Sequence, residues 1–361
     1  MRRGPDAVKR ERTGAIAHGA AAGAERLSYA WVAFILLVIL VAVNGMRDPE
    51  LMSGAGLLSL CATAVPLVLL ALAVTPSMLT GRGGIDLSLG PLAGFITVLI
   101  GSFMHAGIWG NPFVVVIACL TLGAATGAVN GGIITVFRVQ PIVVTLGTYL
   151  VLSGLADNYS PSSGGVVPGW LLRWAGTVAG IPVAVILLVV VSVSWMFLRR
   201  TQYYIWLMGV GADDRVAYTS GRNVGLVRLV AYVLGGIIAG LAGLALTALI
   251  NGGSSSVGPP YTLQSVAAVA LGGTSLAGGR GGMFGSVVGA VDIFLIENLL
   301  TVLNVSVFGL DLAYGVILIL AIVGNAWTSW MVGSRVRRRL VPGTPRALPE
   351  EKGLSVGGSK W

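Results

Sequence analysis

The stretch GRGGIDLSLGPLAGF occupies residues 81–95, and long apolar runs lie on both sides of it. Its one carboxylate, Asp86, stands at the edge of an apolar segment, where a charged side chain is costly and needs a reason. Two interpretations remain open at this point. Either Asp86 or Ser88 caps a helix that tolerates Pro91 near its start, or the stretch is an irregular element that lines a polar path.

The composition of the whole chain is that of a polytopic membrane protein. Of the 361 residues, 55% are hydrophobic and only 10% are charged, whereas soluble domains carry about 25% charged residues. The 53 glycines suit transmembrane helices that pack closely. The net charge of +9 resides in tails and short loops, so we expect it to orient the chain in membrane lipid and predict no nucleic-acid partner.

Residue types that carry catalysis or bind metals are missing or isolated. Cys61 and Cys119 both lie in apolar runs, and His18 and His105 have no neighbouring ligands. No Gly-x-x-x-x-Gly-Lys-Ser/Thr loop is present to bind a nucleotide. We therefore predict no enzyme activity, metal site or cofactor in this chain.

Hydropathy predicts an all-α polytopic protein with about ten transmembrane helices and both termini in the cytoplasm. A polar tail (1–26) precedes the transmembrane domain (27–332), and a basic tail (333–361) follows it. This topology leaves only Arg47 and Arg173, of the 23 lysines and arginines, on the outer side. We expect an uncleaved first helix rather than a signal peptide. The predicted spans are 27–43, 54–78, 86–104, 112–137, 141–156, 181–198, 229–250, a shorter span ending near 275, 283–303 and 307–330.

Glycine spacing adds two predictions. Gly123, Gly127 and Gly131 in the fourth span recur every four residues, which indicates a helix-packing face, and the seventh span has a similar small-residue face at 236–243. The sequence Gly-Arg-Gly-Gly occurs at 81–84 and again at 279–282. It indicates either an internal repeat, which is common in transporters, or a chance match.

The longest polar stretch between spans, residues 199–228, contains a predicted short helix. Asp213 can cap it, Asp214 suits its positive end and Gly221 suits its stop. Such a helix docks into another protein or is a turn in a solvated loop. Both interpretations stay open.

Carboxylates at membrane depth raise a second hypothesis, an ion-coupled secondary carrier that uses Asp86, Asp292 and Glu297. Asp292 and Glu297 lie five residues apart, so they do not share a helix face well. A structural or water-facing role is favoured for these two residues, and their function stays open.

Three segments occur in order along the chain: GIDLSLG at 84–90, QPIVVTLGT at 140–148 and LGGTSLAGGRG at 271–281. Within a match over roughly residues 50–330, they resemble the membrane permeases of ribose-type ABC importers for monosaccharides. GIDLSLG at 84–90 is similar to the family's Gly-Ile-Asp-Leu-Ser-Val-Gly signature, and QPIVVTLGT at 140–148 is similar to its Pro-Phe-Ile-Val-Thr-Leu-Gly-Thr segment. LGGTSLAGGRG at 271–281 is similar to its Gly-Gly-Thr-Ser-Leu-Ser-Gly-Gly run. Related amino-acid and nucleoside permeases have Asn where Asp86 stands, which favours the sugar branch.

The resemblance implies a permease subunit in the cytoplasmic (inner) membrane of a bacterium. ATP and Mg would be bound by separate cytoplasmic ABC ATPase subunits, and an extracytoplasmic sugar-binding protein would deliver a monosaccharide or related polyol to outer loops 157–180 and 251–262. A second permease copy or a sister permease would complete the path. The sugar, the type of dimer and the ATPase stay open.

The resemblance also makes residues 209–224 the element that couples the permease to the ATPase, although Arg215, Val216 and Arg222 depart from the family pattern. The coupling residues are Gly211, Asp213, Asp214, Ala217, Ser220, Gly221 and Asn223. Polar groups expected to line the substrate path are Asp86, Ser88, Asn130, Thr145, Thr148 and Asn298.

Overall fold

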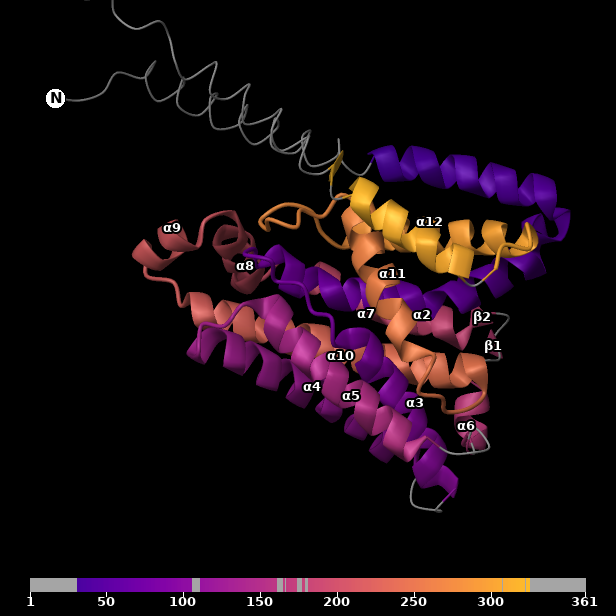
Figure 1. Cartoon of the computed structure of the whole chain (residues 1–361), viewed down its shortest axis with the longest axis horizontal. Helices are drawn as coiled ribbons and strands as arrows, with labels where there is room; N and C mark the ends of the chain where they lie inside the picture. Colours follow the sequence, from indigo (N-terminus) through magenta and orange to yellow (C-terminus); the bar gives the residue numbers. More distant parts are fainter. Residues whose placement is uncertain are drawn as a thin grey trace, which may run out of the picture.

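Helix α2 (Gly54–Leu79) runs through the middle of the computed structural model (Figure 1). Every residue from Ala64 to Leu79 is buried, because this part of the helix carries apolar side chains on all its faces. The core of the molecule is therefore centred on α2. The helices that pack around it are α3 (Leu89–His105), α7 (Val183–Leu198), α10 (Val224–Ile250), α11 (Gly258–Leu271) and α12 (Met283–Val302).

Three further helices flank this core. α4 (Pro112–Val136) packs along α10, and α5 (Pro141–Tyr159) packs on α3. Helix Trp31–Arg47, drawn in indigo, lies beside α12 on the far side of the core (Figure 1). Asn44 joins these last two helices, because its amide donates a hydrogen bond of 3.2 Å to the carbonyl of Leu295. A last helix, Phe308–Ala321, follows α12.

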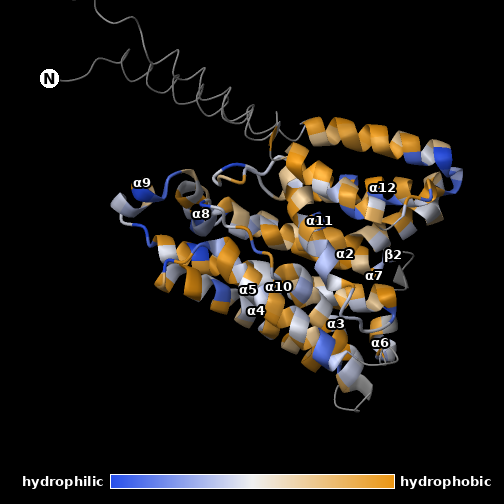
Figure 2. Ribbon diagram, viewed as in Figure 1, coloured by the Kyte–Doolittle hydropathy of each residue, from blue (hydrophilic) through white to orange (hydrophobic). Residues whose placement is uncertain are grey.

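The two ends of the molecule carry different short elements. At one end, hereafter the α9 end, lie α8 (Gln202–Ala212) and α9 (Asp214–Thr219) (Figure 1). The opposite end carries η1 (Pro49–Met52), α6 (Gly169–Leu172) and the antiparallel strands β1 (Thr177–Val178) and β2 (Ile181–Pro182). Hydrophobic residues cover most of the long helices, and hydrophilic residues are concentrated toward these ends (Figure 2).

The structure describes the central part of the chain with short gaps. The predicted tails, 1–26 and 333–361, lie outside the described residues, as do the start of the predicted first span and the end of the tenth. The described residues are 31–105, 111–160, 165, 167–173, 177–178, 181–306, 308–321 and 323–324.

Within these residues, four helices are long and apolar enough to cross a membrane, namely α2, α4, α10 and α12. A fifth span results if α7 and α8 are taken together, but they meet at an angle of 81°. The predicted eighth span corresponds to α11, whose 14 residues reach about 21 Å at ~1.5 Å per residue, less than the ~30 Å of a hydrocarbon core. The all-helical membrane class is confirmed, and the count of ten spans stays a prediction.

The structure differs from the approximate predicted boundaries in two places. The segment 199–228 is not a continuous polar stretch, because it contains α8, which is largely apolar and buries Leu207 and Val210, and the first turn of α10. α3 begins at Leu89 rather than at Asp86, because residues 81–88 form an irregular loop whose polar groups bond to one another and to other helices.

The predicted glycine faces meet in a close helix contact, that of α4 with α10. A side chain at Gly123 would meet the carbonyl oxygen of Gly236, and a side chain at Gly236 would meet that of Gly123. A side chain at Gly127 would meet the carbonyl oxygen of Tyr232. Gly236 and Gly240 therefore face α4, where glycine lets the backbones touch, whereas Gly243 faces Ile96 of α3.

Candidate functional site

The loop 81–88 is braced by the carboxylate of Asp86. Its Oδ1 accepts hydrogen bonds from the amide of Ser88 (3.0 Å) and from the Ser88 hydroxyl (2.6 Å), an Asx-type turn. Among the described residues, neither side chain accepts a bond from an amide of α3, so the helix-cap interpretation is wrong. Asp86 is almost fully buried, and its Oδ2 has no hydrogen-bond partner in this part of the chain.

A chain of hydrogen bonds extends from this loop into α4 and α5. The Asn130 amide donates to the Ser88 hydroxyl (2.9 Å), and the Thr148 hydroxyl donates to the Asn130 oxygen (2.6 Å). The Thr145 hydroxyl donates to the carbonyl of Ile85 (3.2 Å). Five of the six predicted path residues therefore lie in one cluster, hereafter the polar cluster: Asp86, Ser88, Asn130, Thr145 and Thr148.

Burial decides what this cluster can do in the observed conformation. Ser88, Asn130 and Thr145 have no exposed surface, and only Thr148 is half-buried. The cluster therefore ties the loop 81–88 to α4 and α5 by hydrogen bonds that satisfy buried polar groups, and only its α5 side reaches the surface. Asn298 lies elsewhere, because its amide donates to the Asn44 oxygen (3.0 Å) and links α12 to helix Trp31–Arg47.

The predicted short helix is present as α9, with the predicted cap. Asp213 precedes it, and its Oδ1 accepts from the amides of Arg215 (2.9 Å) and Val216 (3.1 Å). Gly221, with φ +77°, follows the end of the helix, as predicted. Asn223 caps the next helix, α10, by accepting from the amide of Leu226 (3.0 Å).

Asp214 connects α9 to two distant segments. Its Oδ2 lies 2.7 Å from Nε of Arg82, in the loop before α3, and 3.3 Å from Nη2 of Arg228, in the second turn of α10. Arg82 Nη2 also donates to Oδ1 (3.2 Å), so the contact is bidentate. Neither arginine was predictable as a partner from the sequence, because they lie 132 and 14 residues from Asp214.

The C-terminal end of α8 meets the two Gly-Arg-Gly-Gly turns. The amide of Gly279 donates to the carbonyl of Leu79 (3.1 Å). A side chain at Gly211 would meet that same carbonyl, and one at Gly278 would meet the backbone of Gly81. Gly211, a predicted coupling residue, therefore sits where both turns touch. Nearby, burial raises the pKa of the Tyr203 hydroxyl, which stays protonated and donates to the carbonyl of Val227 (3.1 Å).

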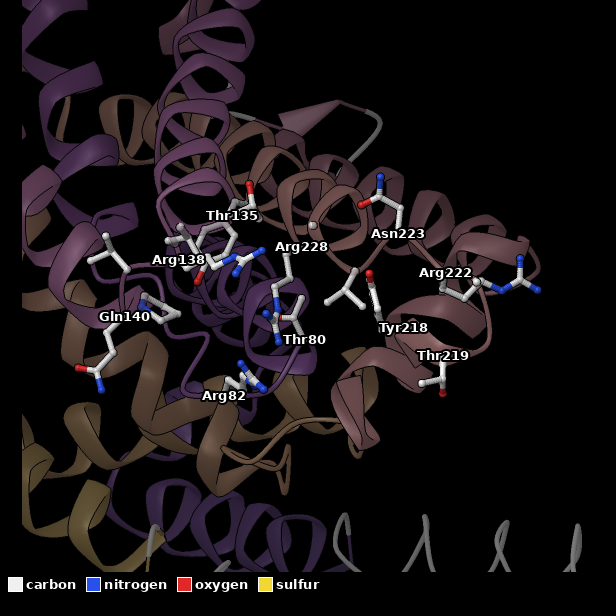
Figure 3. Close-up of a pocket in the computed structure, with 17 residues that line it drawn as sticks. Thr80, Arg82, Thr135, Arg138, Gln140, Tyr218, Thr219, Arg222, Asn223 and Arg228 are labelled. Atoms are coloured by element: carbon white, nitrogen blue, oxygen red, sulfur yellow. The ribbon is translucent and has the colours of Figure 1, made fainter. Parts of the chain in front are cut away.

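A cavity of ≈ 1130 Å³ opens at the α9 end, between the α4–α5 turn, the α9–α10 turn and the loop 81–88. Its lining includes Arg82, Arg138, Arg222 and Arg228 (Figure 3). This cavity has no signal in the sequence, because its arginines come from segments that are far apart in the chain.

Comparison with known proteins identifies the family. The family described as "Branched-chain amino acid transport system / permease component" matches residues 56–323. The ribose import permease protein RbsC of Escherichia coli K12 is 32% identical over 312 residues, which cover 83% of this chain and 96% of that protein. Its namesake in Bacillus subtilis 168 is 32% identical over 295 residues, 80% of this chain and 90% of that protein.

The autoinducer 2 import system permease protein LsrC of Shigella flexneri is 29% identical over 343 residues, 90% of this chain and 95% of that protein. No solved structure matches the chain. The family match covers α2 to α12 and the helix after it, and so includes both the polar cluster and α9. The chain is a membrane protein and belongs to this family of transport-system permease components.

Proposed function

We propose that this chain is the permease subunit of an ATP-driven importer that moves a monosaccharide or a related polyol across the bacterial cytoplasmic membrane. The observation that carries the proposal is the match to ribose import permeases over almost their whole length. The Asp86 loop, which distinguishes the sugar branch in the resemblance, supports the same substrate class. The substrate in this proposal is a pentose, a hexose or a related polyol.

In this proposal the chain binds neither ATP nor Mg. Separate ATPase subunits would bind both, a soluble or lipid-anchored protein would deliver the sugar on the outer side, and a second copy or a sister permease would complete the path. The α9 end would face the cytoplasm, because the Lys and Arg distribution places residues 199–228 there.

The ATPase would engage α9, where Val216 and Tyr218 expose 60% and 73% of their surfaces. Asp214 supports this role, because its two ion pairs tie α9 to the loop before α3 and to α10. A displacement of α9 would therefore pull on the polar cluster through Arg82 and the loop 81–88. Thr148, the half-buried member of that cluster, would be the first to meet a sugar hydroxyl.

Deletion of the gene should abolish ATP-dependent uptake of one sugar from a panel of radiolabelled pentoses, hexoses and polyols, and the wild-type gene should restore it. Uptake of every panel member at the parental rate would contradict the proposal. Binding of the same panel to the cognate binding protein would identify the sugar independently of the permease.

An ion-coupled carrier is not favoured by the comparisons, which match permease components throughout. Asp292 is fully buried in α12 and neither of its carboxylate oxygens has a partner among the described residues, whereas Glu297 is partly exposed. The test is uptake by the purified chain alone in liposomes under a proton or sodium gradient. Gradient-driven uptake without an ATPase would support the carrier instead.

A further inference from the structure

The cavity at the α9 end carries more positive charge than its neighbours neutralise. Arg82, Arg138 and Arg228 line it from three different segments, and no acidic residue is among its lining residues. Asp214, just outside, pairs with Arg82 and Arg228. Arg138 has no ion pair in the described part of the chain, so three positive charges face two carboxylates, Asp214 and the buried Asp86, which lies near Tyr232.

Arg222 does not add to this group. Its guanidinium lies 4.8 Å from the centre of the Trp206 ring, a cation–π contact, and Figure 3 shows it pointing away from the other arginines. Arg82, Arg138 and Arg228, by contrast, point toward the same part of the cavity (Figure 3). The positive charge is therefore concentrated on the side formed by the α4–α5 turn, the loop 81–88 and α10.

A second, independent feature indicates a missing acceptor. Tyr232 lines the cavity, is 1% exposed, and its hydroxyl has no hydrogen-bond partner among the described residues. A buried hydroxyl without a partner costs free energy, on the order of 1–3 kcal/mol. The N-terminus of α5 also faces this region, and its N-cap residue, Gln140, makes no side-chain cap. Both features suit a bound anion.

The rim of the cavity decides which anion fits. Four apolar residues, hereafter the rim, flank the lining residues of the α4–α5 turn in the chain without being lining residues themselves. Val136 and Phe137, just before Arg138, are each 72% exposed, and Ile142 and Val143, just after Pro141, are 44% and 58% exposed. A soluble phosphate has no apolar part to contact this rim, whereas a lipid has acyl chains that can pack against it. Basic pockets between helices on the cytoplasmic side suit anionic lipid headgroups.

We propose that this cavity binds the phosphate of an anionic phospholipid, held by Arg138, Arg228 and the Tyr232 hydroxyl, with its acyl chains on the apolar rim. The site is separate from the sugar path and does not depend on which substrate is carried. Because it lies beside α9 and the loop 81–88, lipid bound there would stabilise the junction between these segments.

Native mass spectrometry of the full chain in detergent, with added phosphatidylglycerol or phosphatidylcholine, tests the proposal. We expect phosphatidylglycerol to bind at least fivefold more tightly, and Arg138→Gln to weaken it roughly fivefold, the effect of about one basic residue. Arg280→Gln is the matched control, an exposed arginine outside the cavity, and should leave binding unchanged. Equal affinity for the two lipids would overturn the proposal. An equal loss of phosphatidylglycerol affinity in Arg138→Gln and Arg280→Gln would also overturn it.

Two further arms separate the alternatives. Inorganic phosphate should not displace phosphatidylglycerol, and displacement at equal concentration would overturn the lipid assignment. Tyr232→Phe removes only the hydroxyl, so it should fold, and we expect phosphatidylglycerol binding to weaken roughly fivefold. Unchanged binding in this variant would remove Tyr232 from the site and contradict the proposal as stated.

Discussion

At the scale of single residues, two aspartates perform related tasks in different surroundings. Asp86 is buried and braces its own loop through Ser88, whereas Asp214 is partly exposed and joins segments that are far apart in the chain. Both aspartates hold the loop 81–88 by accepting hydrogen bonds. Asp86 belongs to the loop and accepts from Ser88, whereas Asp214 lies on α9 and accepts from Arg82. The loop is thus fixed at both ends by a carboxylate.

For Asp86 we predict that Asp86→Asn keeps both stability and uptake, because the amide oxygen can accept the same two bonds. Asp86→Ala leaves the buried Ser88 hydroxyl without its acceptor and should lower the free energy of unfolding by about 1–3 kcal/mol. Thermal unfolding in detergent measures this. Asp48→Ala is the control, since Asp48 accepts the same type of bond from the amide of Glu50, but this bond is exposed to solvent. An Asn variant as unstable as the Ala variant would contradict the prediction.

For the Asp214 pairs we predict that Arg228→Gln impairs transport more than Arg82→Gln. The Arg228 side chain is 16% exposed and that of Arg82 is 61% exposed, so solvent screens the Arg82 pair more strongly. We expect a roughly fivefold to tenfold loss of substrate-stimulated ATP turnover for Arg228→Gln, corresponding to about 1–1.4 kcal/mol. The assay uses the complex with its ATPase at equal membrane insertion. Equal effects of the two variants would argue against coupling through Asp214.

At the scale of secondary-structure elements, the contact of α4 with α10 shows how glycine spacing becomes structure. The glycines of one helix meet the backbone of the other directly, so α4 is held against the core by backbone contact rather than by interlocking side chains. α5, in contrast, contacts mainly α3 and exposes Ile142, Val143 and Leu146. Its position depends more on the hydrogen bonds of Asn130, Thr145 and Thr148.

We predict opposite effects for two alanine substitutions on α4. Gly123→Ala would place a methyl group against the carbonyl of Gly236 and should destabilise the protein by about 1–3 kcal/mol. Gly132→Ala meets nothing within 4 Å and should be stabilising by roughly 0.5–1 kcal/mol, because alanine is the better helix former. The melting temperatures of the two variants test this, and we expect Gly123→Ala to melt below the wild type and Gly132→Ala above it. Similar melting temperatures would mean that α4 and α10 are not in backbone contact.

At the scale of the whole molecule, the two ends carry different sets of short elements. One end holds α8, α9, the two Gly-Arg-Gly-Gly turns and the arginine-lined cavity, and the other holds η1, α6 and the two short strands. The charge pattern of the sequence predicts that the first end lies inside the cell. In the proposed orientation, the first end would contact the cytoplasmic partners and the other end would receive the substrate.

This orientation predicts a labelling pattern. In a chain with Cys61 and Cys119 replaced, a cysteine at Met46, which is 83% exposed, should react with a membrane-impermeant maleimide added to intact cells. A cysteine at Thr219, exposed on α9, should react only after the membrane is opened. Labelling of Thr219→Cys in intact cells would reverse the proposed orientation.

Local properties of the chain were readable from the sequence alone. Apolar runs identify the membrane class, the spacing of Asp213, Asp214 and Gly221 identifies α9, and small residues every four positions identify a packing face. Each of these depends on neighbours in the chain, because hydropathy, helix capping and helical periodicity act over one or a few turns.

Contacts between distant residues were decided only by the tertiary structure. It places Asp214 between Arg82 and Arg228, gathers Asp86, Ser88, Asn130, Thr145 and Thr148 into one cluster, and separates Asn298 from them. It also shows that Asp86 holds a loop instead of capping α3. Which helix faces meet depends on the packing of all helices together, and the spacing of residues along one chain does not encode that.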